Sequence, residues 1–385
     1  MPFDAEAWRW LAQDAEEECV RVAARLDELA GVVDLLGTRP IGWTSTKQVT
    51  ALLRQRGHQV PDSSDESLAA LGADDALIPL LRHHRDLYKR ASTYGQEYLE
   101  HVNLATGRIH PSFRQLGAAS GRMSCSAPNL QQVPRKAAYR ACFRSPEGRS
   151  LIKADLSQIE LRVIAEVAGD GRMIGAFARG EDLYRVTAGR LLGKAVAEVT
   201  KSERQLSKAL TLGFCFGLGP LTLVQNAAAA GVQVSEVEAR QLRTRFFQNF
   251  PGISAWHSRQ QHSEVTETRT LTGRRRLDVT AFTKRVNTPV QGSAADILKL
   301  ALGFLWDSRD QCPSALLVNA VHDELDLEAD ADSASSARHW LIGCMERAMG
   351  EVLKKVPVTG AVEALIGRDW SMQEPPSVEV NNAAA

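Results

Sequence analysis

The chain has 385 residues, enough for two or three small domains or for one large interlocked one. Its hydrophobic content of 44% and charged content of 24% are those of an ordinary globular protein. No apolar run approaches the roughly 20 residues that a membrane-spanning helix needs. The formal net charge is zero, with 46 basic and 46 acidic residues, which argues against a uniformly basic nucleic-acid-binding protein.

The charges are unevenly distributed along the chain, and the cysteines are scattered. The charges gather in the acidic segments 14–18, 62–66 and 323–332 and in the basic segments 135–144, 204–208 and 274–276. A neutral total can conceal a basic cleft on an acidic body, so weak or salt-sensitive DNA binding is expected. The six cysteines form no Cys-x-x-Cys pair, and Met1–Trp8 does not resemble a secretory signal. These features predict reduced thiols in a cytosolic compartment.

The N-terminal part is predicted to be helical. Apolar residues recur at helical spacing over Glu16–Leu36, and Gly37–Pro40 breaks the pattern. A capped helix is predicted over Ser45–Leu53 and a longer one over Asp75–Val102. Residues 104–134, rich in Gly, Ser, Pro and Asn, are predicted to form loops.

The rest of the chain alternates between strands and helices. A strand is predicted over Ser150–Asp155 and a helix over Ile159–Ala168, followed by mainly helical segments from 172 to 305. Ala315–Val321 and Glu324–Glu328 then form a predicted hairpin, although its turn lacks the usual Asn-Gly or Asp-Gly pair. Helices, a strand, many helices, a hairpin and a helix predict an α+β fold with a helical insertion between sheet strands.

Two aspartates stand at the ends of predicted strands. Asp155 ends the first strand, and Asp323 lies at the turn of the hairpin. If these strands are neighbours, the two carboxylates meet and repel each other unless a cation lies between them. A few hard oxygen ligands together with substrate phosphates suit Mg²⁺ and two-metal phosphoryl transfer. Alternatively, Asp155 caps the following helix and Asp323 occupies a turn, and Glu324 is either a third ligand or part of an exposed strand face.

A basic stripe lies on a predicted helix between these strands. Arg204, Lys208, Leu212 and Phe216 are spaced by four, so they share one helical face. An arginine and a lysine that face a triphosphate, followed by an apolar platform for a base, would form a nucleotide-binding helix. The alternative is a solvated basic face of a surface helix.

These segments together resemble the polymerase domain of family A DNA polymerases. The motifs are Asp-x-Ser-Gln-Ile-Glu-Leu-Arg at 155–162, Arg-x-x-x-Lys-x-x-x-x-Gly-x-x-x-Gly at 204–217 and Val-His-Asp-Glu at 321–324. Further matches lie at 120–124, 128–131, 272–276 and 287–296. The resemblance covers roughly residues 85 to 372 and is collinear throughout, which makes it specific.

The resemblance implies a right-hand architecture, with a reduced thumb in 1–108, a palm with an antiparallel sheet in 109–168 and 312–385, and mostly helical fingers in 169–311. It implies a template-directed DNA polymerase that adds dNTPs to a primer 3′-hydroxyl on primer-template DNA, with two Mg²⁺ ions or alternatively Mn²⁺. A monomer is expected in the cytoplasm of a bacterial or phage-infected cell, associated with the nucleoid. The short N-terminal part implies no proofreading domain, and the reduced thumb implies low processivity or a replication partner protein.

The resemblance also assigns roles to individual residues. Asp155, Asp323 and Lys208 are expected to be catalytic, and the metal ligands would be Asp155, the carbonyl of Leu156, Asp323 and Glu324. The incoming nucleotide would be bound by Gln158, Tyr184, Arg204, Lys208, Leu212 and Phe216, with Glu160 excluding a ribose 2′-hydroxyl. The primer and the duplex would be contacted by Arg122, Arg276, Asn287, Gln291 and His322, because donors in the minor groove can check base-pair shape without reading sequence.

Five positions depart from the pattern common in the family. They are Leu156 for Tyr, Tyr184 for His, Thr211 for Asn, Leu212 for Phe or Tyr, and Phe216 for Tyr. Phe216 lacks a hydroxyl with which to hydrogen-bond Glu160, so a looser sugar gate is expected. Two competing functions are a single-subunit RNA polymerase, which Glu160 disfavours, and a non-catalytic primer-template scaffold, which the joint presence of the charged motif residues disfavours.

Leu212 should make the enzyme discriminate strongly against dideoxynucleotides. A leucine has no hydroxyl that could substitute for the missing sugar 3′-OH, so Leu212→Tyr is expected to relax the discrimination. The measurement is the ratio of incorporation efficiencies for a ddNTP and the matching dNTP. Equal incorporation of the two by the parent would contradict the prediction.

Overall fold

The computed structural model describes residues 1–31, 41–72, 74–229, 233–261, 264 and 266–373, and these form two compact units. The first unit comprises Met1–Trp8, His101–Gly169 and Ser263–Ala385. The second comprises Arg9–Glu100 and Asp170–His262. In the described part of the chain, no helix combines the length and the apolar character that crossing a membrane requires.

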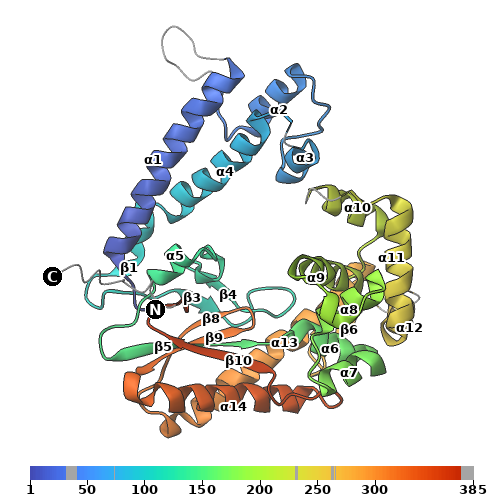
Figure 1. Ribbon diagram of the computed structural model, residues 1–385. Helices are drawn as coiled ribbons and strands as arrows, with labels where there is room; N and C mark the ends of the chain where they lie inside the picture. The colour runs from blue at the N-terminus through green and yellow to red at the C-terminus, as the bar shows by residue number, and fades with distance from the viewer. Residues whose placement is uncertain (32–40, 73, 230–232, 262–263, 265, 374–385) are drawn as a thin grey trace, which may run out of the picture. The chain divides into compact units, whose positions relative to one another are not determined.

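A four-stranded antiparallel sheet forms the centre of the first unit (Figure 1). Its strands follow the order β10 (Val362–Gly367), β5 (Arg149–Leu156), β9 (Glu324–Asp330) and β8 (Leu316–Val321). The predicted strand and hairpin are therefore confirmed, and they are neighbours in one sheet. Strand β10 was not predicted.

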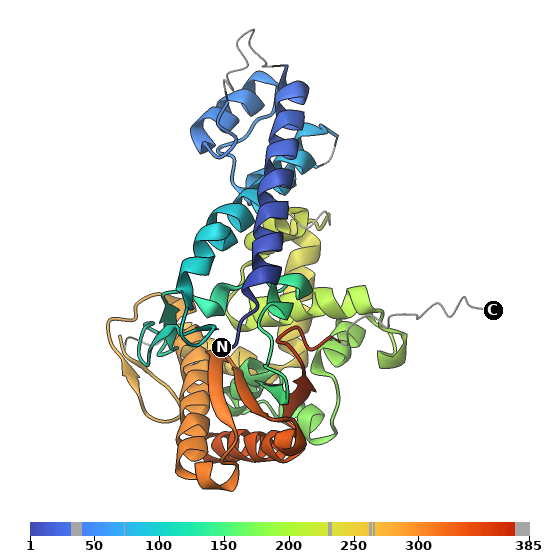
Figure 2. The same ribbon diagram turned by 90° about the vertical axis from the view of Figure 1, so that its left-hand side faces the viewer.

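Three helices accompany the sheet in the first unit. They are α6 (Ile159–Ala168), whose predicted bounds are confirmed, α13 (Phe282–Asp307) and α14 (Ala334–Val352). Helix α14 runs alongside the strands and packs on β5, β9 and β10, and α13 packs against α14 (Figure 2). Alternation along β9 buries Leu325 and Leu327 opposite Ala154 and Ile152, which gives the sheet one apolar face.

An aromatic cluster packs in the first unit beside α5 (Ala137–Ala141). The rings of Trp8 and Tyr139 meet edge to face at 5.3 Å, as do those of Phe143 and Trp370. Trp8, Phe143 and Trp370 are fully buried. Such edge-to-face pairs add about 0.5–1.5 kcal/mol each to the free energy gained from burial, so the cluster fixes the segment that follows β10.

Short ribbons that the sequence did not predict occur in the first unit. They are β1 (Val102–Asn103) with β2 (Arg108–Ile109), β3 (Ser112–Arg114) with β4 (Ser124–Ser126), and β6 (Thr268–Arg269) with β7 (Arg275–Arg276). The predicted loop over 104–134 therefore contains strands, the helix predicted to reach Val102 is wrong at that residue, and β6 and β7 interrupt a segment predicted to be mainly helical. Strands of two or three residues carry too little periodicity to be recognised in a sequence.

The second unit contains an N-terminal group of helices, α1 (Ala5–Ala30, from Arg9 onward), α2 (Thr46–Gln55), α3 (Asp65–Ala70) and α4 (Leu77–Tyr94). Helix α1 begins earlier than predicted, and the predicted break at 37–40 lies outside the described residues. Ser45 caps α2 as predicted, because its hydroxyl accepts a hydrogen bond from the Gln48 amide. Helix α4 ends earlier than predicted, and a short 3₁₀ helix follows it.

The other helices of the second unit are α7 (Gly171–Ala178), α8 (Leu183–Leu192), α9 (Lys201–Cys215), α10 (Pro220–Ala229), α11 (Glu236–Asn249) and α12 (Pro251–Gln261). Their mainly helical character was predicted. The buried carboxylate of Asp170 accepts hydrogen bonds from the amides of Arg172 and Met173 in α7 and of Gly252 in α12. One side chain therefore fixes the start of two helices.

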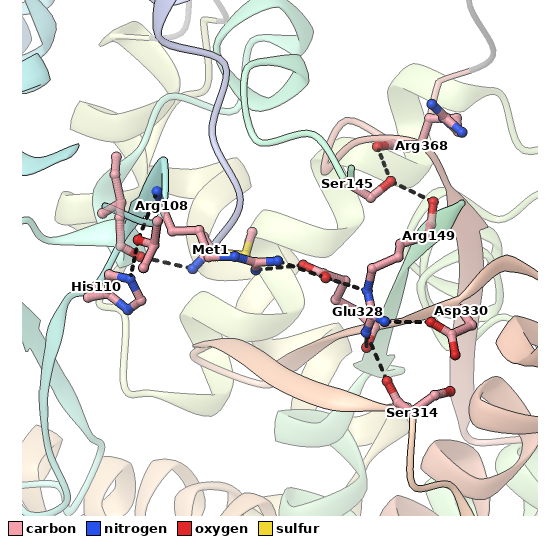
Figure 3. Close-up of polar contacts among 11 residues, drawn as sticks. Met1, Arg108, His110, Ser145, Arg149, Ser314, Glu328, Asp330 and Arg368 are labelled. Carbon is pink, nitrogen blue, oxygen red and sulfur yellow. Dashed lines mark hydrogen bonds and ion pairs between the residues drawn. The ribbon is translucent and has the colours of Figure 1, made fainter. Parts of the chain in front are cut away.

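A buried glutamate ties the far end of the sheet to the rest of the first unit (Figure 3). The carboxylate of Glu328 is fully buried and accepts two hydrogen bonds from Arg108, at 2.7 and 2.9 Å, and a third from Arg149. Burial opposes the ionisation of Glu328, but the two guanidinium groups outweigh it and hold its pKa below the ordinary value. Arg149 also reaches Asp330 and the Ser314 carbonyl.

Glu328→Gln should destabilise the protein by about 3 kcal/mol, because it leaves the partly buried guanidinium of Arg108 without its anion and removes one of the two anions bound by Arg149. The folded-state pKa of Glu328 is lower than its unfolded value, so its stabilisation is complete above the unfolded pKa and is lost as the pH falls through the folded pKa. In urea unfolding, the difference in stability between the parent and the variant should therefore be smaller at pH 4 than at pH 7. Asp330→Asn, at a more exposed partner of Arg149, should cost less than about 1 kcal/mol. A similar loss in both variants at pH 7 would contradict the prediction.

Candidate functional site

Strand pairing brings the predicted acidic residues together in the first unit. Strands β5 and β9 place Asp155 directly opposite Glu324. The amide of Leu156 donates a hydrogen bond of 3.1 Å to the carbonyl oxygen of Asp323 in the β8–β9 turn. The two aspartates therefore stand at the same end of one sheet, as the sequence predicted for neighbouring strands.

The unpredicted strand β10 adds another carboxylate. Glu363 lies opposite Asp155 on its other side, and its Oε1 accepts a hydrogen bond of 2.8 Å from the Ser157 hydroxyl. The only sequence signal for this strand is the short run Val-Glu-Ala-Leu-Ile-Gly at 362–367. Asp155 thus lies between acidic residues on both neighbouring strands.

Burial and mutual repulsion disfavour the charged forms of these carboxylates. Burial, followed by the negative charges of Asp323, Glu324 and Glu363, raises the pKa of Asp155 to about 7. Burial also raises the pKa of Asp323, although the positive charges of Arg122 and His322 oppose the shift. A bound cation would relieve both costs, so the site favours a divalent ion.

The carboxylates of the site suit a metal ion whose remaining ligands are waters or substrate phosphates. Among the described residues, no group of three or more His, Cys, Asp or Glu side chains is placed so that it could hold a metal ion by itself. Mg²⁺ is commonly held by one or two carboxylates together with waters and substrate phosphates, and Asp155 and Asp323 fit that pattern. The arrangement is therefore compatible with an ion that substrate helps to bind.

Glu324 is held by residues that the sequence did not single out. It is 9% exposed, so it does not belong to an exposed strand face, which had been one of two alternatives. Its Oε1 accepts a hydrogen bond of 2.7 Å from the indole nitrogen of Trp370. The guanidinium of Arg140 lies 4.4 Å from the centre of the Trp370 ring. Trp370 fixes the orientation of Glu324 beside Asp155.

Two residues next to the aspartates adopt left-handed backbone conformations. Gln158 has φ 53° and His322 has φ 58°. For residues other than glycine this conformation costs about 1–2 kcal/mol, and such strain is concentrated at functional sites. The Oε1 atom of Gln158 is also buried without a hydrogen-bond partner within the described structure.

The predicted primer-contact residues divide into two groups in the first unit. Arg122 and His322 line one small cavity together with Gln131, and burial followed by the charge of Arg122 lowers the pKa of His322. Asn287 and Gln291 are one turn apart on α13. Arg276 donates a hydrogen bond of 2.8 Å to the Thr288 hydroxyl on the same helix.

The predicted sugar-gate residue has an ionic partner. Glu160, in the first turn of α6, forms an ion pair of 3.0 Å with Arg122. Sequence reasoning had assigned these two residues to different tasks, so the pairing of one with the other was not foreseen.

The predicted basic stripe lies on α9 in the second unit. Arg204, Lys208 and Leu212 are successive members of one helical face, whereas Phe216 is the residue that ends the helix. The buried ring of Tyr184, from α8, lies 5.5 Å from the Arg204 guanidinium and 5.8 Å from the Lys208 ammonium.

Arg204 is further oriented by an acidic neighbour. Its Nε donates a hydrogen bond of 2.6 Å to Asp182, the residue that caps α8. Lys208 is exposed, so its ammonium group can reach an anion without first leaving a buried site. Tyr184 thus serves as a platform beneath both cations, and the helix presents two donors for phosphate oxygens.

Comparisons with known proteins agree with this geometry. Residues 8–372 match the family model described as DNA polymerase family A. DNA polymerase I of Aquifex aeolicus is 39% identical over 80% of this chain and 54% of its own length. The thermostable DNA polymerase I of Thermus aquaticus is 32% identical over 96% of this chain and 45% of its own length. The chain therefore spans about half the length of these relatives or less.

A solved structure also shares the fold. The POL domain of Pol1 from M. smegmatis, in complex with a DNA primer-template and dNTP, matches 97% of this chain and 67% of its own chain. The TM-score is 0.85 and the sequence identity is 27%. The α+β architecture is therefore that of a polymerase domain.

Asp323→Asn should stabilise the metal-free protein while removing its response to metal. Neutralising one of two buried, mutually repelling carboxylates should raise the free energy of unfolding by about 1 kcal/mol at pH 8 in EDTA. Mn²⁺ should raise the melting temperature of the parent and leave the variant unchanged. Asp332→Asn removes an exposed charge from the same acidic segment and should behave like the parent. A variant that is less stable in EDTA, or that Mn²⁺ stabilises as much as the parent, would contradict the prediction.

Proposed function

Since the chain belongs to DNA polymerase family A, we propose that it is a template-directed DNA polymerase that extends a primer 3′-hydroxyl with dNTPs. The observation that carries the proposal is the hydrogen bond from Leu156 to the Asp323 carbonyl, which brings two aspartates to one end of the sheet. Bound there, two Mg²⁺ ions, or Mn²⁺ in their place, would supply Lewis acidity toward the 3′-hydroxyl and the triphosphate.

In this proposal Asp155 and Asp323 hold the metal ions, with the Leu156 carbonyl and Glu324 as further candidate ligands. Their buried position keeps bulk water away from the reacting atoms, which strengthens every charge interaction there. The Trp370 indole restrains Glu324, so the carboxylates keep their arrangement when substrate enters.

Arg204 and Lys208 would bind the incoming triphosphate. The cationic groups of Arg204 and Lys208 would neutralise the charge that develops on the phosphates during the reaction. Of the two, Lys208 is proposed to be a catalytic residue. Tyr184 orients both cations, while Leu212, Phe216 and Gln158 would contact the nucleotide. A triphosphate that pairs with Arg204 must compete with Asp182 for it, so the affinity for the triphosphate should also depend on the ion pair between Arg204 and Asp182.

The remaining assignments follow the same proposal. Arg122, Arg276, Asn287, Gln291 and His322 would contact the primer and the duplex, and Glu160 would exclude ribose. We propose a thumb in 1–108, a palm in 109–168 and 312–385 and fingers in 169–311. The family match over 8–372 supports primer extension as the activity of these residues. We further propose that the protein acts on bacterial DNA as a monomer and that a partner protein provides processivity.

Single-nucleotide extension of a primed template with Mg²⁺ tests this function. The parent should add the correct dNTP, and Asp323→Asn should lower the rate by roughly a thousandfold, because one ligand of the metal pair is lost. Asp332→Asn serves as the matched control and should extend at the parent rate. Extension by Asp323→Asn at the parent rate would overturn the metal assignment. Primer-template binding without extension by any variant would favour a non-catalytic scaffold.

A further inference from the structure

The ion pair between Arg122 and Glu160 connects two parts of the proposed site. The Arg122 Nη2 and the Glu160 Oε1 are 3.0 Å apart, and both side chains are partly buried, with 31% and 23% exposure. A charge-assisted hydrogen bond of this kind is stronger than one between neutral groups. Glu160 therefore has a defined position before any nucleotide binds.

The loop that carries Arg122 is itself fixed by helix α13. The Gly121 carbonyl accepts a hydrogen bond of 2.6 Å from Lys299, and the Ser120 carbonyl accepts one of 2.8 Å from Arg274. Arg274 in turn forms an ion pair of 2.9 Å with Asp296. Two cationic side chains of the first unit, Lys299 and Arg274, thus hold the backbone immediately before Arg122, so the main chain that carries this arginine is held in place.

Gly121 shows how tightly this loop is packed. Its φ is +90°, a left-handed conformation that favours glycine, and a Cβ atom there would lie 2.2 Å from the Arg274 guanidinium. The backbone can approach Arg274 only because residue 121 has no side chain. The anchoring of Arg122 is therefore a specific feature of the loop and of α13.

Arg122 also faces the acidic site. Its side chain lines one small cavity together with Gln131 and His322, so it lies beside the turn that carries Asp323. One arginine is therefore placed between the gate residue on α6 and the catalytic turn of the hairpin. Its guanidinium has five donors in a rigid fork, enough to hold Glu160 and another acceptor at once.

We propose that Arg122 is the positioning residue of the sugar gate and that ribose rejection depends on its ion pair with Glu160. The proposal rests on the proposed polymerase function. A glutamate side chain has three rotatable bonds, and loss of the ion pair with Arg122 should make Glu160 less restrained and more able to admit a 2′-hydroxyl. The pairing also occupies Oε1, which reduces the capacity of Glu160 to accept a hydrogen bond from that hydroxyl.

A double-mutant cycle on the selectivity ratio tests the proposal. The variants are Arg122→Ala, Glu160→Ala and the double variant, and the quantity measured is kcat/KM for a dNTP divided by that for the matching rNTP. Arg122→Ala should lower this ratio roughly fivefold, the size expected for a partly exposed charge pair. In the Glu160→Ala background, the same substitution should leave the ratio unchanged.

Gln291→Ala is the matched control, because Gln291 is another predicted primer contact. Loss of a primer contact alone should lower kcat/KM for both sugars equally, so the ratio should stay at the parent value. Arg122→Lys keeps the charge and should retain more discrimination than Arg122→Ala. If Arg122→Ala has a lower melting temperature than the parent, Arg122→Gln replaces it in the cycle and should lower the selectivity ratio in the same way.

The outcomes separate this proposal from the proposed function. An unchanged ratio in Arg122→Ala, or equal losses of selectivity in the parent and Glu160→Ala backgrounds, would overturn the positioning role while the parent still extends with dNTPs. Failure of the parent to extend with either sugar would instead refute the proposed function. Selectivity lost only when Glu160 is present would support the ion pair as part of the gate.

Discussion

The structure depends on the antiparallel pairing of β5 with β9, which forces like charges together in a buried place. The register sets Asp155 against Glu324, and the turn that follows β8 adds Asp323. Burial and repulsion raise the pKa of Asp155 to about 7, so this arrangement costs stability when no cation is bound. Stability is given up at the point where a metal and a triphosphate would act.

The rest of β9 shows how the fold contains this cost. Its alternate residues Glu324, Asp326 and Glu328 are acidic, and each accepts a hydrogen bond from another side chain. Trp370 donates to Glu324, Asn319 donates to Asp326, and two arginines bind Glu328. Glu328, farthest from Asp155, is bound by two protein cations, whereas Asp155 and Asp323 at the other end of the sheet are the proposed metal ligands. Along β9 the fold therefore passes from a structural ion pair to the proposed metal site.

In the basic helix α9 of the second unit, neighbouring side chains restrain a charged one. Tyr184 and Asp182 hold Arg204 in place, while Lys208 stays exposed. In the first unit the ion pair with Arg122 likewise holds Glu160, the residue proposed to be the sugar gate. In each case a polar or aromatic neighbour restricts a flexible charged side chain, which lowers the entropy that substrate binding must overcome.

The sequence by itself determined the local features. The strand that ends at Asp155, the hairpin around Asp323, helix α6 and the Ser45 cap were predictable, because short-range periodicity and capping rules specify them. Only the tertiary structure decided that β10 brings Glu363 beside Asp155, that Trp370 restrains Glu324 and that Arg122 pairs with Glu160. These contacts join residues far apart in the chain, and no local pattern encodes which distant partner a buried polar group will find.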